Sequence, residues 1–263
     1  MWYLFLRMAL RFSIGKGKRN AWFKKNYTGI YTPIAGRLLL VRNEDEHKFW
    51  IRANWDDGVI ISKKTEPAVL LVFKPKKDQI VLDIGANIGK YTILAGKKVG
   101  IHGKIIAVEP MTKTFQLLQK NIKENGLERI VTPLKVGISN KIGTARFYYK
   151  EGHSGASTMT AQVSNEYDDV NLTTIDEIVK EQNLDRLDWI KIDVEGLEYE
   201  VLSGASNSIL QFRPIIIVEI REGSKEKVFD FLNNMKYNYE QLDEYIGEEH
   251  TYGAFYNFIA MPI

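Results

Sequence analysis

The sequence predicts an α/β protein whose mostly parallel sheet carries helices on both faces. From residue 79 onward, apolar runs alternate with segments of helical character, a pattern typical of parallel sheets covered on both sides. A strand, a glycine turn and a helix follow one another in "VLDIGANIGKYT", residues 81–92. Two further apolar runs close the chain. We therefore expect one doubly wound domain over residues 76–263, preceded by an appendage over residues 1–75.

The domain is expected to contain strands and helices in regular alternation. Asn125-Gly126 is a plausible stop for the second helix, and Thr174 with Glu177 forms a capping box. The strands are expected at 79–85, 104–110, 130–137, 187–196, 214–220, 237–245 and 254–261, with a hairpin around 141–150. The helices are expected at 89–99, 112–125, 174–182, 197–210 and 224–235.

The appendage is expected to consist of strands after residue 36. "RLLLVRN" and "HKFWIRAN" flank the acidic turn "EDE", which predicts a β-hairpin. The run "PAVLLVFKPKKDQ" at 67–79 is expected to be extended and to lead into the glycine turn. No linker sets residues 1–75 apart, so we expect an appendage and not an independent domain.

Composition excludes several classes of protein. The chain has no cysteine, which excludes disulfides, a cysteine nucleophile and a cysteine zinc site. Its four histidines are scattered, which argues against a histidine metal cluster. Residues 1–28 carry seven Lys and Arg and no acidic residue, so the rest of the chain has a net charge of −4. We therefore expect no nucleic-acid partner for the domain.

Residues 1–28 need an explanation of their own. At helical spacing Trp2, Phe5, Leu6, Ala9 and Phe12 share one face, with arginines opposite. This face could cover the protein's own core or lie on an anionic membrane surface. The segment has neither a span long enough to cross a bilayer nor a signal-peptide cleavage pattern. The sequence therefore predicts a cytoplasmic protein, either free or peripheral at the inner face of the membrane.

The glycine turn fits neither common phosphate-binding motif. Aligned on Gly85, the dinucleotide motif requires glycine where Asn87 and Lys90 stand, and the phosphate loop also fails although Gly89-Lys90 is present. Asp83 begins the turn with a carboxylate that would repel phosphate. S-adenosylmethionine carries a positive sulfonium and an α-amino group and no phosphate, so we expect this cofactor.

Two carboxylates at successive strand ends favour the same cofactor. Asp83 can meet its amino acid end directly or through water, and Glu109 can accept both ribose hydroxyls. Alternatively, Asp83 could serve a helix end and Glu109 could be a solvated strand end. The candidate cofactor-binding residues are Asp83, Gly85, Asn87, Gly89, Thr92 and Glu109.

Five segments of the chain resemble a known family. These are "VLDIGANIGKYT", "IIAVEPMTKTFQLLQKNIKENG", "VNLTTIDEI", "WIKIDVEGLEYEVLSGA" and "RPIIIVEI". In this order they look like successive blocks of the FkbM family of S-adenosylmethionine-dependent methyltransferases, from about Phe73 to Glu219. The resemblance implies the class I methyltransferase fold, a seven-stranded sheet with an antiparallel terminal strand. It also implies methylation of a hydroxyl oxygen, often on a sugar or small natural product.

Transfer of a methyl group to an alcohol requires a base or a metal that acidifies the hydroxyl. In a continuous strand Lys191, Asp193 and Glu195 share one face. We expect Asp193 to be the general base and Glu195 to orient the substrate, while a structural pair of Lys191 with a carboxylate is the alternative. Glu219 ends the neighbouring strand, so Asp193, Glu195 and Glu219 are candidate ligands for magnesium.

Other assignments stay open at this level. His153, in the glycine-flanked loop "EGHSGASTM", is a rival base, and such a loop could be a lid. The expected acceptor is a sugar, a glycolipid or a small natural product. An RNA methyltransferase, held to phosphates by the basic N-terminus, and a non-catalytic S-adenosylmethionine-binding protein are the alternatives.

Overall fold

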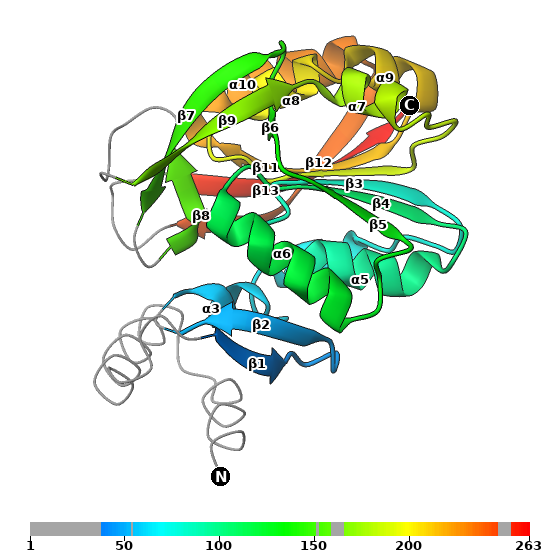
Figure 1. Cartoon of the computed structure of the whole chain (residues 1–263). Helices are drawn as coiled ribbons and strands as arrows, with labels where there is room; N and C mark the ends of the chain where they lie inside the picture. The colour runs from blue at the N-terminus through cyan, green and yellow to red at the C-terminus, as the bar shows by residue number, and fades with distance from the viewer. Residues whose placement is uncertain (1–37, 54, 151–152, 159–165, 247–253) are drawn as a thin grey trace.

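A seven-stranded sheet forms the centre of the computed structural model, which describes residues 38–53, 55–150, 153–158, 166–246 and 254–263 (Figure 1). The central strands β11, β10, β3, β4 and β5 are parallel, and β13 is antiparallel to both of its neighbours. The predicted α/β class and the antiparallel strand near the C-terminus are therefore confirmed. In spatial order the strands are β12 (Tyr237–Ile246), β13 (Ala254–Pro262), β11 (Ile215–Arg221), β10 (Trp189–Ile192), β3 (Ile80–Ile84), β4 (Lys104–Val108) and β5 (Val131–Leu134).

Helices cover both faces of this sheet, because its strands are apolar on both sides. Leu82 points into one hydrophobic core and its neighbour Val81 into the other. Figure 1 shows the two helical layers on opposite sides of the strands. One layer contains α5 (Lys90–Val99) and α6 (Thr112–Glu124), and the other contains α7 (Ile175–Glu181), α8 (Glu198–Ser203), α9 (Ser206–Phe212) and α10 (Lys225–Asn234).

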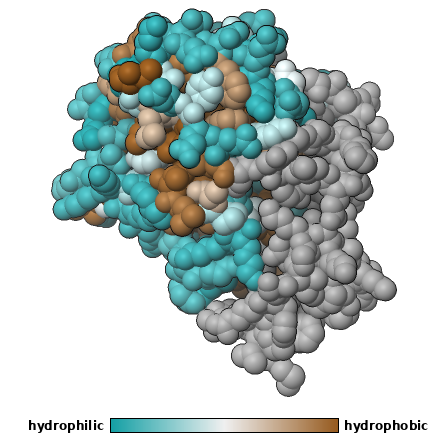
Figure 2. Space-filling model, turned by 180° about the vertical axis from the view of Figure 1, so that it is seen from behind, coloured by the Kyte–Doolittle hydropathy of each residue, from teal (hydrophilic) through white to brown (hydrophobic). Residues whose placement is uncertain are grey.

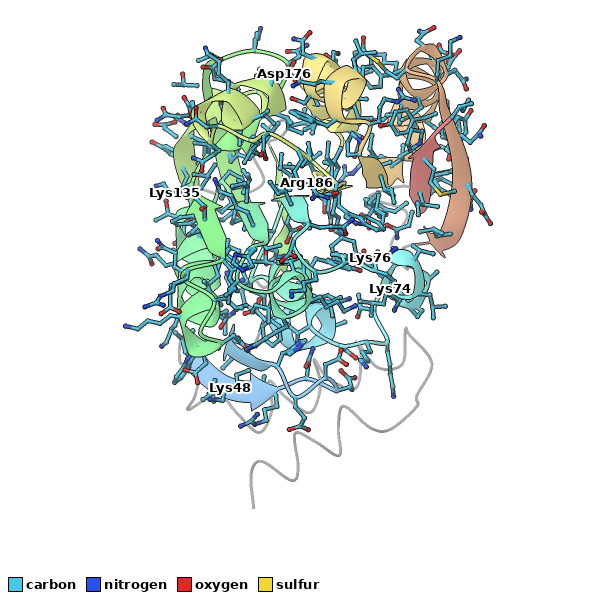
Figure 3. All side chains as sticks on the ribbon, turned by 90° about the vertical axis from the view of Figure 1, so that its right-hand side faces the viewer. Lys48, Lys74, Lys76, Lys135, Asp176 and Arg186 are labelled. Atoms are coloured by element: carbon cyan, nitrogen blue, oxygen red, sulfur yellow. The ribbon has the colours of Figure 1, made fainter. Side chains whose placement is uncertain are left out.

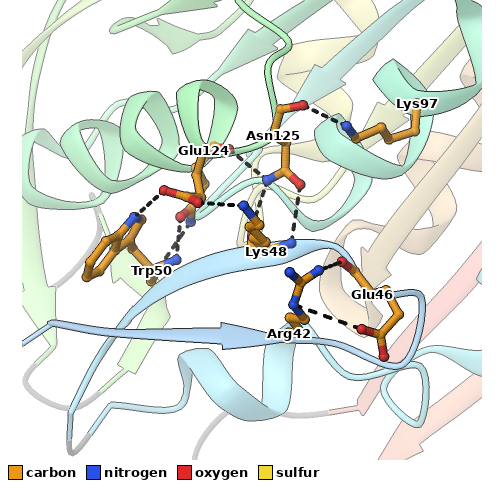
Figure 4. Close-up of polar contacts among 8 residues, drawn as sticks. Arg42, Glu46, Lys48, Trp50, Lys97, Glu124 and Asn125 are labelled. Atoms are coloured by element: carbon orange, nitrogen blue, oxygen red, sulfur yellow. Dashed lines mark hydrogen bonds and ion pairs between the residues drawn. The ribbon is translucent and has the colours of Figure 1, made fainter.

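The predicted N-terminal hairpin is present and packs on α6. Strands β1 (Leu38–Arg42) and β2 (Lys48–Arg52) are antiparallel. The Asn125 side chain donates to the Lys48 carbonyl (2.7 Å) and accepts from the Lys48 N–H (3.2 Å), and the Trp50 indole donates to Glu124 (3.2 Å) (Figure 4). Phe49 of the hairpin belongs to the same core as α5 and α6. The hairpin therefore shares its packing with the domain.

The stretch between the hairpin and β3 differs from the prediction. It contains two short helices, α3 (Asp57–Ile60) and α4 (Pro67–Val72), where strands were expected. Pro67 occupies the first turn of α4, a position in which its missing N–H leaves no helical hydrogen bond unmade. The apolar run from 67 to 73 is too short for its periodicity to separate a helix from a strand.

One predicted helix is broken in two. The segment 197–210 was expected to be continuous, but α8 ends at Ser203 and α9 begins at Ser206. A Cβ added at Gly204 would lie 2.2 Å from the Ser139 carbonyl oxygen, so the chain passes another segment at this glycine without room for a side chain. This contact is distant in sequence and the local pattern carries no trace of it. At the start of the helix predicted over 224–235, a short 3₁₀ turn, η2 (Glu222–Ser224), precedes α10.

A second, smaller sheet lies beside the N-terminal end of α6. Asp168 accepts from the Thr112 N–H (2.6 Å) and from the Tyr149 hydroxyl (2.6 Å), so two strands of this sheet hold the start of the helix. Met111 joins its apolar cluster. The sheet contains β6 (Gly137–Ile138), β9 (Tyr167–Thr173), β7 (Gly143–Lys150) and β8 (His153–Thr158), in spatial order.

The two ends of the parallel strands differ in their surroundings. Lys76 and Arg186 precede β3 and β10, and Figure 3 shows them at the amino ends of the strands, whereas Asp83 and Asp193 lie toward the carboxyl ends. On the reverse side, the described surface is mostly hydrophilic, with apolar side chains gathered near its centre and in a smaller area near the top (Figure 2). Among the described residues no helix is long and apolar enough to cross a membrane. The predicted amphipathic helix within residues 1–28 lies outside the described residues.

Candidate active site

The glycine turn after β3 has backbone conformations that favour glycine. Gly85 has φ +79°, and a Cβ there would lie 1.9 Å from the Asp193 carbonyl oxygen. Gly89 has φ +99° and directly precedes α5, and a Cβ there would lie 2.9 Å from the Leu118 side chain. Asn87 between them also has a positive φ of 50°. Gly85 is therefore required for the close approach of the two strand ends, a reason that the sequence did not reveal.

Glu109 is buried beside this turn at the end of β4. Its Oε2 accepts from the Asn87 N–H (3.0 Å) and its Oε1 from the Met111 N–H (2.9 Å). Burial raises the pKa of Glu109 to about 7, although these two hydrogen bonds and the charge of Arg52 act in the opposite direction. The carboxylate is thus fixed in orientation, and its proton affinity responds to any ligand that donates to it.

Asp83 is buried one strand away and is paired within the protein. The Thr92 hydroxyl donates to Asp83 Oδ2 (2.5 Å), which ties the end of β3 to the first turns of α5. Burial raises the pKa of Asp83, and the charge of Asp193 adds to this rise, while Lys191 and Thr92 oppose it. The structure therefore brings Asp83, Gly85, Asn87, Gly89, Thr92 and Glu109 together around one turn.

Lys191 lies at the centre of a buried group of charges. Its Nζ is 3.1 Å from Asp193 Oδ2 and 4.0 Å from Glu66 Oε1, and it lies 4.5 Å from the centre of the Tyr91 ring. Burial alone would lower the pKa of Lys191, but the carboxylates of Asp193, Glu66 and Asp83 raise it above its usual value. The surrounding carboxylates therefore favour the charged ammonium form of Lys191, although its side chain is buried.

Three carboxylates surround this ammonium. One oxygen each of Glu66, Asp193 and Glu219 lie within 4.8 Å of one another. Burial, followed by the charges of Asp193 and Glu66, raises the pKa of Glu219 well above its ordinary value. The side chain of Asp193 is 33% exposed, compared with 17% for Glu66 and 2% for Lys191. The carboxylate of Asp193 is therefore more accessible to an incoming molecule than the side chains of Glu66 and Lys191.

The expected magnesium ligands are only partly brought together. Glu195 forms an ion pair with Arg221 and is not among the three clustered carboxylates. The strand β10 ends at Ile192 and Glu195 has a positive φ of 22°, so the alternation that placed Glu195 beside Asp193 does not extend that far. A divalent ion held by Glu66, Asp193 and Glu219 would also sit within a few ångströms of the Lys191 ammonium. We conclude that this charged group does not fit magnesium.

The remaining candidate base, His153, lies on β8. Its backbone pairs with Lys150 of β7, and its side chain is outside the described part of the structure. The role predicted for His153 stays a prediction.

Sequence reasoning missed two contributions from the appendage. Glu66 lies between Lys90 and Lys191 in space, but it is outside the segments that resemble the family. Arg52 forms a bidentate pair with the buried Asp57 and donates to Thr114 on α6 (3.2 Å), so its charge acts near Glu109. A glutamate before a proline and an arginine at the end of a strand carry no recognisable motif.

Comparison with known proteins identifies the family. A family model described as the methyltransferase FkbM domain matches residues 83–252. The chain belongs to the FkbM methyltransferase family. S-adenosylmethionine is the methyl donor general to this family.

Individual relatives cover part of the chain. The hexuronic acid methyltransferase AglP of Haloferax volcanii is 33% identical over 160 residues, which are 60% of this chain and 62% of that protein. Methyltransferase sdnD of Sordaria araneosa is 28% identical over 174 residues, 55% of this chain and 67% of that protein. This FkbM-family chain thus spans about two thirds of the length of these relatives. The solved methyltransferase FkbM of Methylobacillus flagellatus is 18% identical, with a TM-score of 0.47 over 71% of this chain and 45% of that chain.

Proposed function

We propose that this protein transfers the methyl group of S-adenosylmethionine to an oxygen of a sugar, a glycolipid or a small natural product, with Asp193 as general base. One observation carries the proposal. The partly exposed carboxylate of Asp193 follows the end of β10, and the Asp193 backbone is bonded to Ile84 at the end of β3 (3.0 Å). An acceptor hydroxyl at Asp193 therefore adjoins the turn assigned to the cofactor.

The residues around the turn fit the cofactor by their chemistry. Glu109 offers carboxylate oxygens, already held by two backbone N–H groups, to the ribose hydroxyls. Asp83 places negative charge beside the position of the amino acid end, while Gly85 and Gly89 keep the turn narrow. When bound, S-adenosylmethionine supplies an electrophilic methyl group on a sulfonium. The chain has to align the acceptor and remove its proton.

The contacts of Asp193 suggest how the proton is removed. Lys191 donates to Oδ2 (3.1 Å), so we assign Oδ1 as the oxygen that accepts the proton of the hydroxyl. Lys191 also fixes the orientation of the carboxylate, because its own side chain is almost fully buried. The Lys191 ammonium supplies a positive charge beside the Asp193 carboxylate, where a magnesium ion would otherwise be needed. We therefore propose base catalysis by Asp193 without magnesium.

The relative AglP supports a sugar acceptor, because that protein is a hexuronic acid methyltransferase. A hexuronic acid offers two kinds of oxygen, hydroxyl and carboxylate. A hydroxyl requires a base and gives a methyl ether, whereas a carboxylate is already ionised at neutral pH and gives a methyl ester. Only a hydroxyl acceptor would need the base that we assign to Asp193, so we propose that the methyl group goes to a hydroxyl. Attachment of residues 1–28 to a membrane, which would bring lipid-linked sugars within reach, stays a prediction.

The test is a labelled-methyl assay with a panel of acceptors. The full chain is incubated with methyl-labelled S-adenosylmethionine and with glucuronides, neutral glycosides, glycolipid extract, RNA and small-molecule extract. We expect label in a carbohydrate-containing acceptor, bound as an ether that survives mild alkali. Label released by mild alkali as methanol would identify ester formation and remove the need for a base. Label in RNA alone, or in none of the fractions, would contradict the proposal.

A further inference from the structure

Glu66 has an unusual backbone conformation for a glutamate. It has φ 52° and ψ 53°, in the left-handed region that residues with a Cβ rarely adopt, and it directly precedes Pro67. A residue before proline is normally extended. Such a conformation is unfavourable by about 1–3 kcal/mol and persists only where the surroundings enforce it. Glu66 is therefore held in place by its contacts.

The contacts of its side chain join the appendage to the active site. Glu66 Oε2 is 3.5 Å from Lys90 Nζ, and Oε1 is 4.0 Å from Lys191 Nζ. Lys90 also donates to the carbonyl of Thr65 (2.7 Å), which holds the backbone at this point. Lys90 is the first residue of α5 and directly follows Gly89 of the cofactor turn. One carboxylate from outside the matched family segment thus contacts both the turn and the cluster around Asp193.

We propose that Glu66 is a positioning residue of the active site, which shares the Lys191 ammonium with Asp193 and thereby keeps Asp193 able to accept a proton. This inference rests on the proposed role of Asp193 as base. A carboxylate paired alone with a buried ammonium is held in its charged form and becomes a weak base. A second carboxylate on the same ammonium opposes that effect, because its negative charge raises the proton affinity of the first.

The charges facing Glu66 agree with this role. Burial would raise the pKa of Glu66, but the charges of Lys191 and Lys90 hold it below its ordinary value, so Glu66 stays ionised at neutral pH. The neighbouring Glu219, by contrast, has a pKa raised well above its ordinary value, chiefly by burial. The titratable groups around Glu66 come from four elements and one loop: Lys90 and Tyr91 of α5, Lys191 of β10, Asp83 of β3, Glu219 of β11, and Asp193.

The size of the effect follows from the geometry. The Glu66 and Asp193 oxygens lie within 4.8 Å. At an effective dielectric constant of about 20, removing one charge at this distance corresponds to about 2.5 pKa units. Because Asp193 is one-third exposed, solvent screening reduces the expected change to about one unit. Removal of the Glu66 charge should therefore lower the titration midpoint of Asp193 by about one pH unit.

A carboxyl titration of the protein without cofactor or acceptor measures this directly. The full chain is labelled with [4-¹³C]aspartate, and the Asp193 signal is assigned by its absence in Asp193→Asn. Its midpoint is compared between wild type, Glu66→Gln and the control Glu46→Gln. Glu46 is an exposed carboxylate of the same appendage that pairs with Arg42, as Figure 4 shows. We expect a downward shift of about one unit in Glu66→Gln and none in Glu46→Gln.

Two outcomes decide the inference. An unchanged Asp193 midpoint in folded Glu66→Gln would overturn it, since a purely structural glutamate lowers the melting temperature without moving the titration. If Glu66→Gln does not fold, Glu66→Asp and [5-¹³C]glutamate labelling replace it. The Glu66 signal, assigned by its loss in Glu66→Asp, must then titrate below pH 4.5 in wild type, and a midpoint at or above pH 4.5 would equally overturn the inference.

The same experiment separates this inference from the proposed function. It needs no methyl acceptor, so the sharing of Lys191 is decided even if no acceptor is methylated. Conversely, wild type could form a methyl ether while the titration midpoint of Asp193 is unchanged in Glu66→Gln. That result would support the proposed function and contradict the role of Glu66.

Discussion

Replacing Glu109 by glutamine should change how the stability of the cofactor-free protein depends on pH. Burial raises the pKa of Glu109 to about 7 in the folded protein, from its ordinary value of 4.5. The unfolded chain therefore loses this proton at lower pH than the folded one. The stabilisation associated with the raised pKa is complete below pH 4.5 and is lost as the pH rises through 7.

The magnitude follows from these two pKa values. Linkage gives wild type a loss of about 2.5 kcal/mol in unfolding free energy between pH 5 and pH 8 from this group alone. Glu109→Gln does not titrate, but its amide nitrogen cannot accept an N–H, so the bond from Asn87 or from Met111 is lost. That loss costs roughly 1–3 kcal/mol at every pH. The difference between variant and wild type should therefore move by about 2.5 kcal/mol in favour of the variant from pH 5 to pH 8.

The assay is urea unfolding followed by tryptophan fluorescence at both pH values, without cofactor. Glu128→Gln replaces an exposed carboxylate of the same region and serves as control, with a difference from wild type that stays constant. A difference for Glu109→Gln that changes by less than about 0.5 kcal/mol would show that Glu109 is not enclosed as described.

Three further predictions follow from the same contacts. Gly85→Ala should unfold or lose at least about 4 kcal/mol of stability, because the added Cβ would meet the Asp193 backbone at a residue with a positive φ. The control is Gly143→Ala, where a Cβ meets nothing within 4 Å. Equal melting temperatures for the two variants would contradict this prediction. S-Adenosylmethionine should bind more weakly below pH 7 and should release protons when it binds at pH 7, because its ribose hydroxyls favour the ionised form of Glu109. Calorimetry in buffers of different ionisation enthalpy measures the number of protons released. An affinity that does not depend on pH would contradict this prediction. EDTA should leave methyl transfer unchanged, and activity lost to EDTA and restored by magnesium would place a metal at the site despite Lys191.

Local patterns predicted most of the fold. The strand, glycine turn and helix at 81–92 appear as β3, the turn and α5, because each depends on neighbouring residues. One half of the predicted capping box is confirmed, since the Glu177 N–H donates to the Thr174 hydroxyl (3.0 Å), while the Glu177 side chain accepts from Lys180 (3.0 Å). The close approach of Gly204 to Ser139 could not be predicted, because the two residues are far apart in the sequence.

In the candidate site, too, the residues that local patterns indicate were predicted, and those placed by distant packing were not. Asp83, Glu109 and Asp193 could be found because each stands at or just after the end of a predicted strand, where ligands of parallel sheets bind. Glu195 was expected beside Asp193 by strand alternation, but the strand ends earlier and Glu195 pairs with Arg221. Glu66 could not be found, since its place beside Lys191 arises from the packing of the appendage and a strained backbone.

The most direct test of the account is the single-turnover rate of methyl transfer in Asp193→Asn. The variant keeps the shape of the side chain and removes its proton-accepting power, so the rate should fall by roughly 10²–10⁴ while cofactor affinity stays near that of wild type. Asp185→Asn, which changes an exposed aspartate at the opposite end of β10, should keep the wild-type rate. A wild-type rate in Asp193→Asn, with normal cofactor binding, would contradict the assignment of Asp193 as the base.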